Sequence, residues 1–381
     1  MDATTVSILA ILLIFIASFI SVETAISVTI VEIVMGIIGG NFLGLQVTPW
    51  MDFLAGFASV LLTFLAGAEV DPDILRSKFK ESMVIGVLSF LLPFLGAIAY
   101  CYWVAGWSLD AAKIAGVALS TTSLAVVYAV LVETGLTKTE IGKIIMASCF
   151  ITDMGTVIAL TLLFSDYSLM TLAFYGGSIL LIFLGFKTIP WVFARFGDRV
   201  IEPEIKFLFL LLFGFMWLAN IGTGHAVLPA FIFGLVMART FNRFANVQRK
   251  LRIVAFALLT PFFFLKAGMN VSLPGIYANL GLLGALFAVK IVAKFIGVFP
   301  VARIYVPGHS QYTTLLMSTG LTFGTISSMY GLSIGAIDNT QFSLLVGTVV
   351  LSAIVPTYIA QRWFEPKGES QLKQTTVLNP E

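Results

Sequence analysis

A single carboxylate lies inside a long apolar stretch of the chain. Asp153, within "CFITDMGTVIAL" (149–160), is the only charged residue between Lys143 and Asp166. An ionised group in apolar surroundings is costly unless it is paired or hydrated, and such groups in membrane spans mark ion and proton pathways. The position of Asp153 therefore predicts a site that binds a proton or a small cation, but not both at once.

Two lysines are candidates for the opposite charge. Lys290 and Lys294, in "AVKIVAKFIG" (288–297), are the only charged residues between Lys266 and Arg303. They are four residues apart, so they share one face of a helix. We expect Lys294 to neutralise Asp153 when no cation is bound, and we assign Lys290 a secondary role.

Hydroxyl groups cluster in two further apolar stretches. "LSTTSLAVV" (119–127) has four in a row, and "MSTGLTFGTISSMYG" (317–331) is dense in Ser, Thr and Gly. Na⁺, Li⁺ and K⁺ favour oxygen ligands, which hydroxyls and unpaired carbonyls supply. With Asp153 as the carboxylate that binds the metal cation, the predicted additional ligands are the hydroxyls of Thr121, Thr122, Ser123 and Thr152.

Glu32 is a second acid in an apolar segment, "TIVEIVMGIIGG" (29–40). It could line a vestibule or pair structurally, so we keep it as a secondary candidate. Two other interpretations compete. Lys290 and Lys294 could form the substrate site of an anion carrier or symporter, because helix N-termini at mid-membrane attract anions. An intramembrane aspartyl protease would need Glu32 to face Asp153 as a second carboxylate.

The composition is that of an all-α integral membrane protein. Hydrophobic residues make up 59% of the chain and charged residues 11%, with a mean hydropathy of +1.00, whereas soluble domains have about 25% charged residues. The net charge of +2 gives no reason to expect nucleic acid as a partner, and no cofactor is predicted. We predict about thirteen transmembrane helices in the lipid bilayer: 6–21, 24–41, 50–69, 82–105, 110–132, 139–165, 167–189, 203–221, 224–240, 252–272, 277–303, 311–333 and 338–361.

Basic residues occur mainly in the odd-numbered loops and the tail. Because cytoplasmic loops carry an excess of Lys and Arg, this pattern places the N-terminus outside and the C-terminus in the cytoplasm. We therefore expect a single transmembrane unit over 1–362 and a short cytoplasmic tail over 363–381. The residues that carry the pattern are Arg76, Lys78, Lys80, Lys138, Lys143, Arg195, Arg199, Arg243, Arg249, Lys250, Arg303, Arg362, Lys367 and Lys373.

The two hydroxyl-rich stretches occupy matching positions in the two halves. With 167–189 set aside as a linker helix, each is the fifth span of its half, and the halves begin on opposite sides of the membrane. This arrangement predicts an inverted repeat of about 1–165 and 203–362, with two discontinuous helices that cross near the midplane. The alternative is that the small residues only allow close helix packing.

Six segments in order resemble the monovalent cation:proton antiporter-2 family, and within it the NapA-type Na⁺/H⁺ antiporters and the membrane domain of Kef-type K⁺/H⁺ transporters. The segments are "IVEIVMGIIGGNFLGL", "LLTFLAGAEVDPDIL", "ALSTTSLAVVYAVLVETGL", "GKIIMASCFITDMGTVIALTLLF", "LTPFFFLKAGMNVSL" and "AKFIGVFPVARI".

The resemblance implies an NhaA-like fold, with a core domain from about 82–165 and 252–333, a separate dimerisation domain and elevator-like alternating access. It also implies a homodimer in the cell inner (plasma) membrane. By this resemblance Asp153 falls on the ion-binding aspartate and Lys294 on the lysine that pairs with it. Thr122 and Ser123 fall in the broken helix.

The chain departs from the family pattern at three points. Thr152 stands where relatives carry Asp, Asn or Gln, and "GLTFG" (320–324) replaces an RGE-like stretch. No nucleotide-binding domain follows the last span, which argues against a Kef-type K⁺/H⁺ antiporter, the main alternative. We expect a secondary active antiporter that exchanges Na⁺, or Li⁺ or K⁺, for H⁺ at Asp153. One carboxylate favours electroneutral exchange, unless Lys294 carries a second proton.

Overall fold

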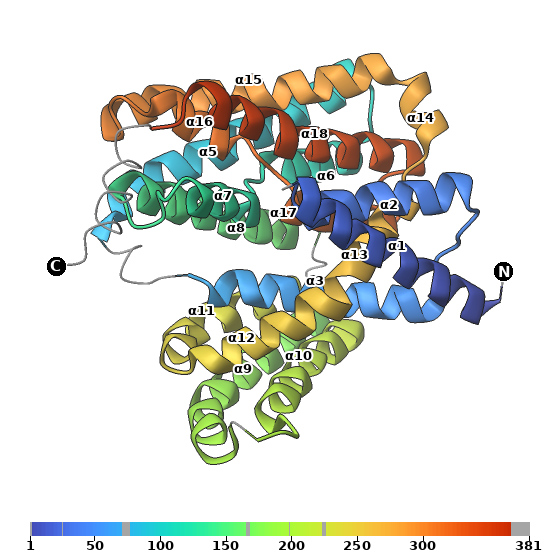
Figure 1. Ribbon diagram of the computed structural model, residues 1–381, viewed down its shortest axis with the longest axis vertical. Helices are drawn as coiled ribbons and strands as arrows, with labels where there is room; N and C mark the ends of the chain where they lie inside the picture. Colours follow the sequence, from blue (N-terminus) through green and yellow to red (C-terminus); the bar gives the residue numbers. More distant parts are fainter. Residues whose placement is uncertain are drawn as a thin grey trace. The chain divides into compact units, whose positions relative to one another are not determined.

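The computed structural model describes residues 2–24, 26–70, 77–164, 168–197, 199–222 and 226–366, in which all regular secondary structure is helical (Figure 1). Within these ranges ten helices are long and apolar enough to cross a membrane, and α2 (Val28–Phe42) is a shorter apolar helix. The prediction of an all-α, multi-pass membrane protein is therefore confirmed, while the count of thirteen stays a prediction. The predicted tail lies outside the described residues from Lys367 onward.

The chain divides into two compact units, of which unit 1 comprises Met1–Pro72 and Val157–Asn270. In unit 1, α12, η2 and α13 join into one continuous helix, Ala245–Met269. Besides α2, the elements of unit 1 are α1 (Ala3–Thr24), α3 (Pro49–Ala68), α9 (Leu169–Phe196), α10 (Pro203–Gly222), α11 (Val227–Arg243), α12 (Ala245–Val254), the π-helical turn η2 (Ala255–Leu259) and α13 (Thr260–Met269).

Glycines bring pairs of helices into backbone contact in unit 1. A Cβ atom on Gly36 of α2 would lie 2.1 Å from the carbonyl oxygen of Leu265, and one on Gly268 of α13 would lie 2.0 Å from that of Ile33. Small residues permit this approach, which is a main source of helix association in membranes. The contact of α2 with α13 fixes the helix that carries Glu32.

Unit 2 comprises Asp73–Thr156 and Val271–Glu381. It contains α5 packed against both α6 and α15, and α17 packed against α6 and α18. The elements are α5 (Phe79–Ala99), the π-helical turn η1 (Tyr100–Val104), α6 (Leu109–Ser120), α7 (Leu124–Glu133), most of α8 (Glu140–Phe164), α14 (Leu273–Ala278), α15 (Leu280–Tyr305), α16 (Ser310–Met317), α17 (Thr322–Ser333) and α18 (Asn339–Trp363).

Two short non-helical segments separate these helices in the hydroxyl-rich stretches. We call residues 121–123, between α6 and α7, the first break, and residues 318–321, between α16 and α17, the second break. The backbone N–H of Ser123 donates to the carbonyl of Thr319 at 3.1 Å, and Oγ1 of Thr122 donates to the carbonyl of Met317 at 2.9 Å. One hydrogen bond therefore connects the two breaks directly and a second connects the first break to the end of α16, and together they satisfy part of the backbone that the helices leave unpaired.

Within the described residues each predicted span overlaps a helix or a helix pair, but several ends differ. The span predicted to stop at 189 continues past Pro190 to Phe196, because packing in a bundle tolerates a proline within a helix. The span predicted to begin at 252 starts at Ala245. Its first turns are amphipathic, with Val247 and Leu251 buried, so overall hydropathy did not indicate them.

Candidate functional site

Close packing of α8 against α5 positions Asp153. A Cβ atom on Gly86 of α5 would lie 2.5 Å from Cβ of Ile151, and Gly155 of α8 faces the ring of Phe90. At the start of α8, Glu140 forms a 2.7 Å salt bridge with Lys78, and this contact raises the pKa of the lysine above its usual value. These contacts at Ile151 and Gly155, one before and one after Asp153 in the chain, hold α8 close to α5.

The Asp153 carboxylate is almost fully enclosed. Its side chain is 3% exposed, and Oδ1 has no hydrogen-bond partner among the described residues. The neighbouring hydroxyls donate to backbone carbonyls of their own helix and not to Asp153: Oγ1 of Thr152 donates to the Cys149 carbonyl at 2.6 Å, and Oγ1 of Thr156 donates to the Thr152 carbonyl at 2.9 Å. A buried polar atom without a partner is unfavourable, so this oxygen is suited to a proton or a cation.

Lys294 is fully buried, and its ammonium is hydrogen-bonded to three oxygens. It donates to Oγ of Ser89 at 2.9 Å, to the carbonyl of Ser120 at 2.8 Å and to Oγ1 of Thr122 at 2.9 Å. These acceptors lie on α5, at the end of α6 and in the first break. An ammonium has three protons to donate, so the surroundings of Lys294 satisfy a charged lysine.

Lys290 is equally buried but has different surroundings. Its Nζ has no hydrogen-bond partner within the described part of the chain. The ammonium occupies space that Gly320 leaves in the second break: a Cβ atom there would lie 2.3 Å from Nζ and 2.8 Å from Oγ1 of Thr121. Lys294 therefore donates three hydrogen bonds, one of them to the first break, whereas Lys290 lies beside Gly320 of the second break and has no partner among the described residues.

Asp153 and Lys294 interact electrostatically, but they form no salt bridge in the described residues. The Lys294 ammonium is instead bonded to Ser89, Ser120 and Thr122. In this conformation the lysine supplies positive charge near the carboxylate without occupying its free oxygen. The direct pairing expected from the sequence stays a prediction for another state of the protein.

The remaining candidates divide between the two units. Thr121, Thr122 and Ser123 are buried in the first break, where Thr121 donates to the Ala118 carbonyl at 3.1 Å and Ser123 accepts from the Val126 N–H at 3.4 Å. Glu32 belongs to unit 1, where it is buried and its Oε2 has no hydrogen-bond partner among the described residues.

Sequence reasoning missed two participants. Ser89 accepts a hydrogen bond from Lys294, and Gly320 makes room for Lys290. A serine in the middle of an apolar span is a weak signal, and only the three-dimensional packing shows which lysine each residue meets. Among the described residues no three His, Cys, Asp or Glu side chains cluster as a metal site. A cation at Asp153 would therefore depend on neutral oxygens for its other ligands.

In unit 2 the buried Asp153, two buried lysines and two neighbouring breaks lie among apolar helices, which is the arrangement expected of a multi-pass ion transporter. Residues 6–365 match the family described as "Sodium/hydrogen exchanger, transmembrane". The chain belongs to this sodium/hydrogen exchanger family, which confirms the resemblance to the cation:proton antiporters.

Named relatives agree with this assignment. The chain is 26% identical to the "Probable Na(+)/H(+) antiporter 3" of Methanocaldococcus jannaschii over 91% of this chain and 92% of the relative. It is 24% identical to the "Na(+)/H(+)-K(+) antiporter GerN" of Bacillus cereus, over 88% and 90%. The relatives are transporters, so the prediction that the protein is not an enzyme is confirmed.

A solved structure shares the fold. The sodium proton antiporter MjNhaP1 from Methanocaldococcus jannaschii, determined at pH 8, superposes with a TM-score of 0.70 at 18% identity, covering 98% of this chain and 99% of that chain. At this identity the likeness establishes the helical architecture alone.

Proposed function

We propose that this protein is a secondary active antiporter that exchanges Na⁺, or another monovalent cation, for H⁺ at a single buried aspartate. The observation that carries the proposal is the carboxylate of Asp153, enclosed at 3% exposure with Oδ1 unpartnered among the described residues. A proton and a cation compete for this oxygen. Exposure of the site to each side of the membrane in turn converts that competition into coupled exchange.

The side chains around Asp153 have separate roles in this scheme. Thr152 and the hydroxyls of the first break, Thr121, Thr122 and Ser123, provide oxygens within the same unit for a partly dehydrated cation. Lys294 provides the counter-charge. Its three hydrogen bonds hold it beside the first break. In this scheme Lys294 moves toward Asp153 when the cation leaves, so the two steps are coupled.

The architecture proposed for this cycle is an inverted repeat of about 1–165 and 203–362. The pairs α6/α7 and α16/α17 are its discontinuous helices, and the core is built from about 82–165 and 252–333. Interrupted backbone is tolerated at membrane depth only where protein or a water-filled cavity surrounds it, and the mutual hydrogen bonds of the two breaks meet that condition. We further propose a homodimer in the plasma membrane, with the N-terminus outside and the C-terminus in the cytoplasm.

The proposal is tested by ΔpH-dequenching in proteoliposomes with Li⁺, Na⁺, K⁺ and Rb⁺. The wild type is expected to respond to Na⁺, and Asp153→Asn is expected to abolish the response to every cation, because the amide cannot exchange a proton. Retention of full exchange by Asp153→Asn would show that the site is elsewhere.

One carboxylate favours one-for-one, electroneutral exchange. If Lys294 carries a second proton, exchange is electrogenic. Currents on solid-supported membranes separate the two cases, since a Na⁺-dependent current that disappears in Lys294→Gln would overturn the electroneutral assignment.

Two observations support alternatives on the same scaffold. The name of the relative GerN, a Na⁺/H⁺-K⁺ antiporter, includes K⁺, so K⁺/H⁺ exchange is the first alternative, and the series of Li⁺, Na⁺, K⁺ and Rb⁺ distinguishes it. The unpartnered ammonium of Lys290 would suit an anion carrier or symporter. That function predicts uptake of an anion that depends on Lys290 and Lys294 but not on Asp153.

A further inference from the structure

Helix α12 presents two faces of different character. On the inner face Val247 and Leu251 are buried, and Lys250 forms salt bridges with Glu202 at 2.8 Å and Glu204 at 3.2 Å. These contacts attach α12 to the start of α10. The opposite face is exposed and includes two arginines.

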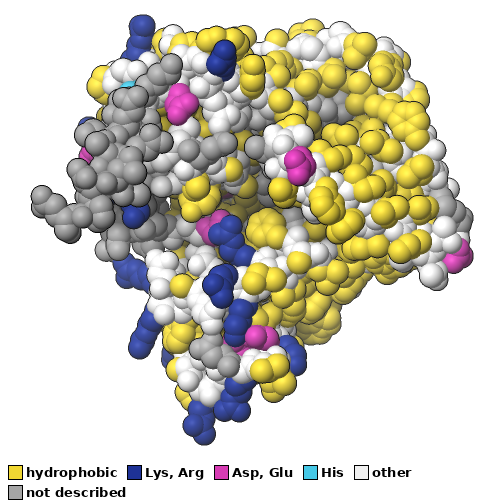
Figure 2. All heavy atoms as spheres, in the orientation of Figure 1, with side chains coloured by type: hydrophobic (Ala, Val, Ile, Leu, Met, Phe, Trp, Pro, Cys, Tyr) yellow, Lys and Arg dark blue, Asp and Glu magenta, His cyan; other side chains and the backbone are white. Residues whose placement is uncertain are grey.

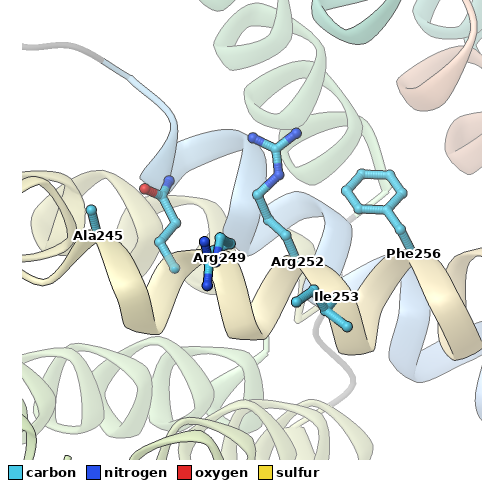
Figure 3. Close-up of a pocket in the computed structure, with 6 residues that line it drawn as sticks. Ala245, Arg249, Arg252, Ile253 and Phe256 are labelled. Carbon is cyan, nitrogen blue, oxygen red and sulfur yellow. The ribbon is translucent and has the colours of Figure 1, made fainter. Parts of the chain in front are cut away.

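An open groove runs along this exposed face (Figure 3). It has a volume of about 430 Å³ and is lined by Ala245, Gln248, Arg249, Arg252, Ile253 and Phe256. The spacing of these residues places them in a row on one side of the continuous helix. The first part of the groove is basic and polar, whereas Ile253 and Phe256 form an exposed apolar end.

The two arginines differ in their partners. Arg249 is exposed and forms no salt bridge in the described ranges. Arg252 forms a 3.2 Å salt bridge with Glu69, next to the end of α3, and its guanidinium lies 5.7 Å from the centre of the Phe256 ring. Both members of this ion pair are partly exposed, and such pairs contribute little to stability. A stronger acceptor can therefore displace Glu69.

The segment that carries the groove is basic, although acids of other segments pair with Arg252 and Lys250. From Arg239 to Phe256 the chain has five basic residues and no acid, and Figure 2 shows basic side chains gathered over the part of unit 1 that contains α11 and α12. Basic residues at the ends of membrane spans are expected from topology alone. Topology does not require two of them to share a groove with an apolar end.

We propose that this groove binds one anionic phospholipid, with its phosphate on Arg249 and Arg252 and an acyl chain along Ile253 and Phe256. Guanidinium groups bind phosphate through paired hydrogen bonds. From Arg249 to Phe256 the helix rises about 10 Å, enough to lead from a headgroup into the hydrocarbon region. When the phosphate binds, Arg252 releases Glu69, so lipid and carboxylate compete for the same guanidinium.

The test measures thermal unfolding of the purified full-length protein in nanodiscs. The discs contain phosphatidylcholine with an increasing fraction of phosphatidylglycerol of identical acyl chains. Variants are Arg249→Gln, which breaks no ion pair of the described residues, and the double variant Arg249→Gln/Arg252→Gln. Arg239→Gln/Arg243→Gln removes the same charge from α11, outside the groove, and serves as the matched control.

Phosphatidylglycerol is expected to raise the melting temperature of the wild type and of the α11 control to the same extent. The rise should be smaller by at least half in Arg249→Gln and absent in the double variant. Glu69→Gln removes the internal competitor, so half of the full rise should be reached at a several-fold lower fraction of phosphatidylglycerol.

Three results would overturn the proposal. The first is an equal effect of the two lipids on the wild type. The second is a loss in the α11 control as large as in the double variant, which would indicate general attraction by charge. The third is an equal rise with inorganic phosphate in phosphatidylcholine discs, which would assign the groove to a free anion. If the double variant does not fold, Arg249→Gln and Glu69→Gln decide the outcome.

Discussion

The two breaks receive lysines from the same helix, but their surroundings differ. Lys294 donates three hydrogen bonds, one of them to Thr122 of the first break, whereas Lys290 lies beside Gly320 of the second break with no hydrogen-bond partner in the described residues. The lysines are one turn apart on one face of α15 and are both fully buried. The two residues are thus of the same type, on the same helix face and equally buried. They differ in the hydrogen-bond acceptors that other helices supply, which among the described residues are present at Lys294 and missing at Lys290.

Among substitutions that test the comparison of the two lysines, Lys294→Met is expected to have the largest effect. The substitution removes three charge-assisted hydrogen bonds and leaves the carboxylate of Asp153 without a nearby positive charge, so we expect exchange in proteoliposomes to fall by roughly 100-fold or more, equivalent to about 2.7 kcal/mol. The melting temperature of the purified variant should also fall. Exchange within threefold of the wild type would remove the distinction between the two lysines.

Gly320→Ala should have the next largest effect. Its Cβ atom would overlap Nζ of Lys290 and Oγ1 of Thr121, and overpacking of this kind costs about 1–3 kcal/mol. We expect a lower melting temperature and exchange reduced about tenfold. The double variant Gly320→Ala/Lys290→Ala should recover most of the loss, because the smaller side chain vacates the space. A double variant that is as impaired as Gly320→Ala would place Lys290 elsewhere.

Lys290→Met tests whether the lysine without hydrogen-bond acceptors is needed for stability or exchange. Replacing a buried donor that lacks an acceptor with an apolar side chain of similar length is nearly neutral or stabilising, so the melting temperature should stay the same or rise by a few degrees. Exchange should remain within about threefold of the wild type. If Lys290→Met is as inactive as Lys294→Met, the unpartnered lysine takes part in transport directly, and the anion carrier alternative gains support.

The smallest effect is expected from Thr152→Val. Among the described residues the hydroxyl donates to the carbonyl of Cys149 in its own helix and has no other hydrogen bond, so its removal should leave the fold intact. We expect exchange to persist with a change of a few-fold in the relative apparent affinities for Na⁺ and K⁺, read from the cation dependence of dequenching. Unchanged selectivity would show that Thr152 does not contact the cation.

Most of the helical organisation could be predicted because a membrane span leaves a simple signal. Long apolar stretches with few charges must become helices, since lipid offers no hydrogen bonds to the backbone. The clusters of Ser, Thr and Gly predicted interruptions within 119–127 and 317–331, and non-helical residues lie in both stretches, at 121–123 and 318–321. Their crossing as discontinuous helices of an inverted repeat stays a prediction. It failed at the start of α12, where the buried face is only a stripe of apolar residues among basic ones.

The amino-acid sequence by itself determined that this is an all-helical membrane protein of the sodium/hydrogen exchanger type with one acid in its sixth apolar stretch. The cost of a lone charge in lipid made Asp153 visible without any structure. Tertiary structure decided which oxygens meet Lys294, that Gly320 leaves space for Lys290 and that two arginines share a groove with exposed apolar side chains. Such relations depend on contacts between helices that are far apart in the chain, and the order of apolar and polar residues along the sequence does not specify these contacts.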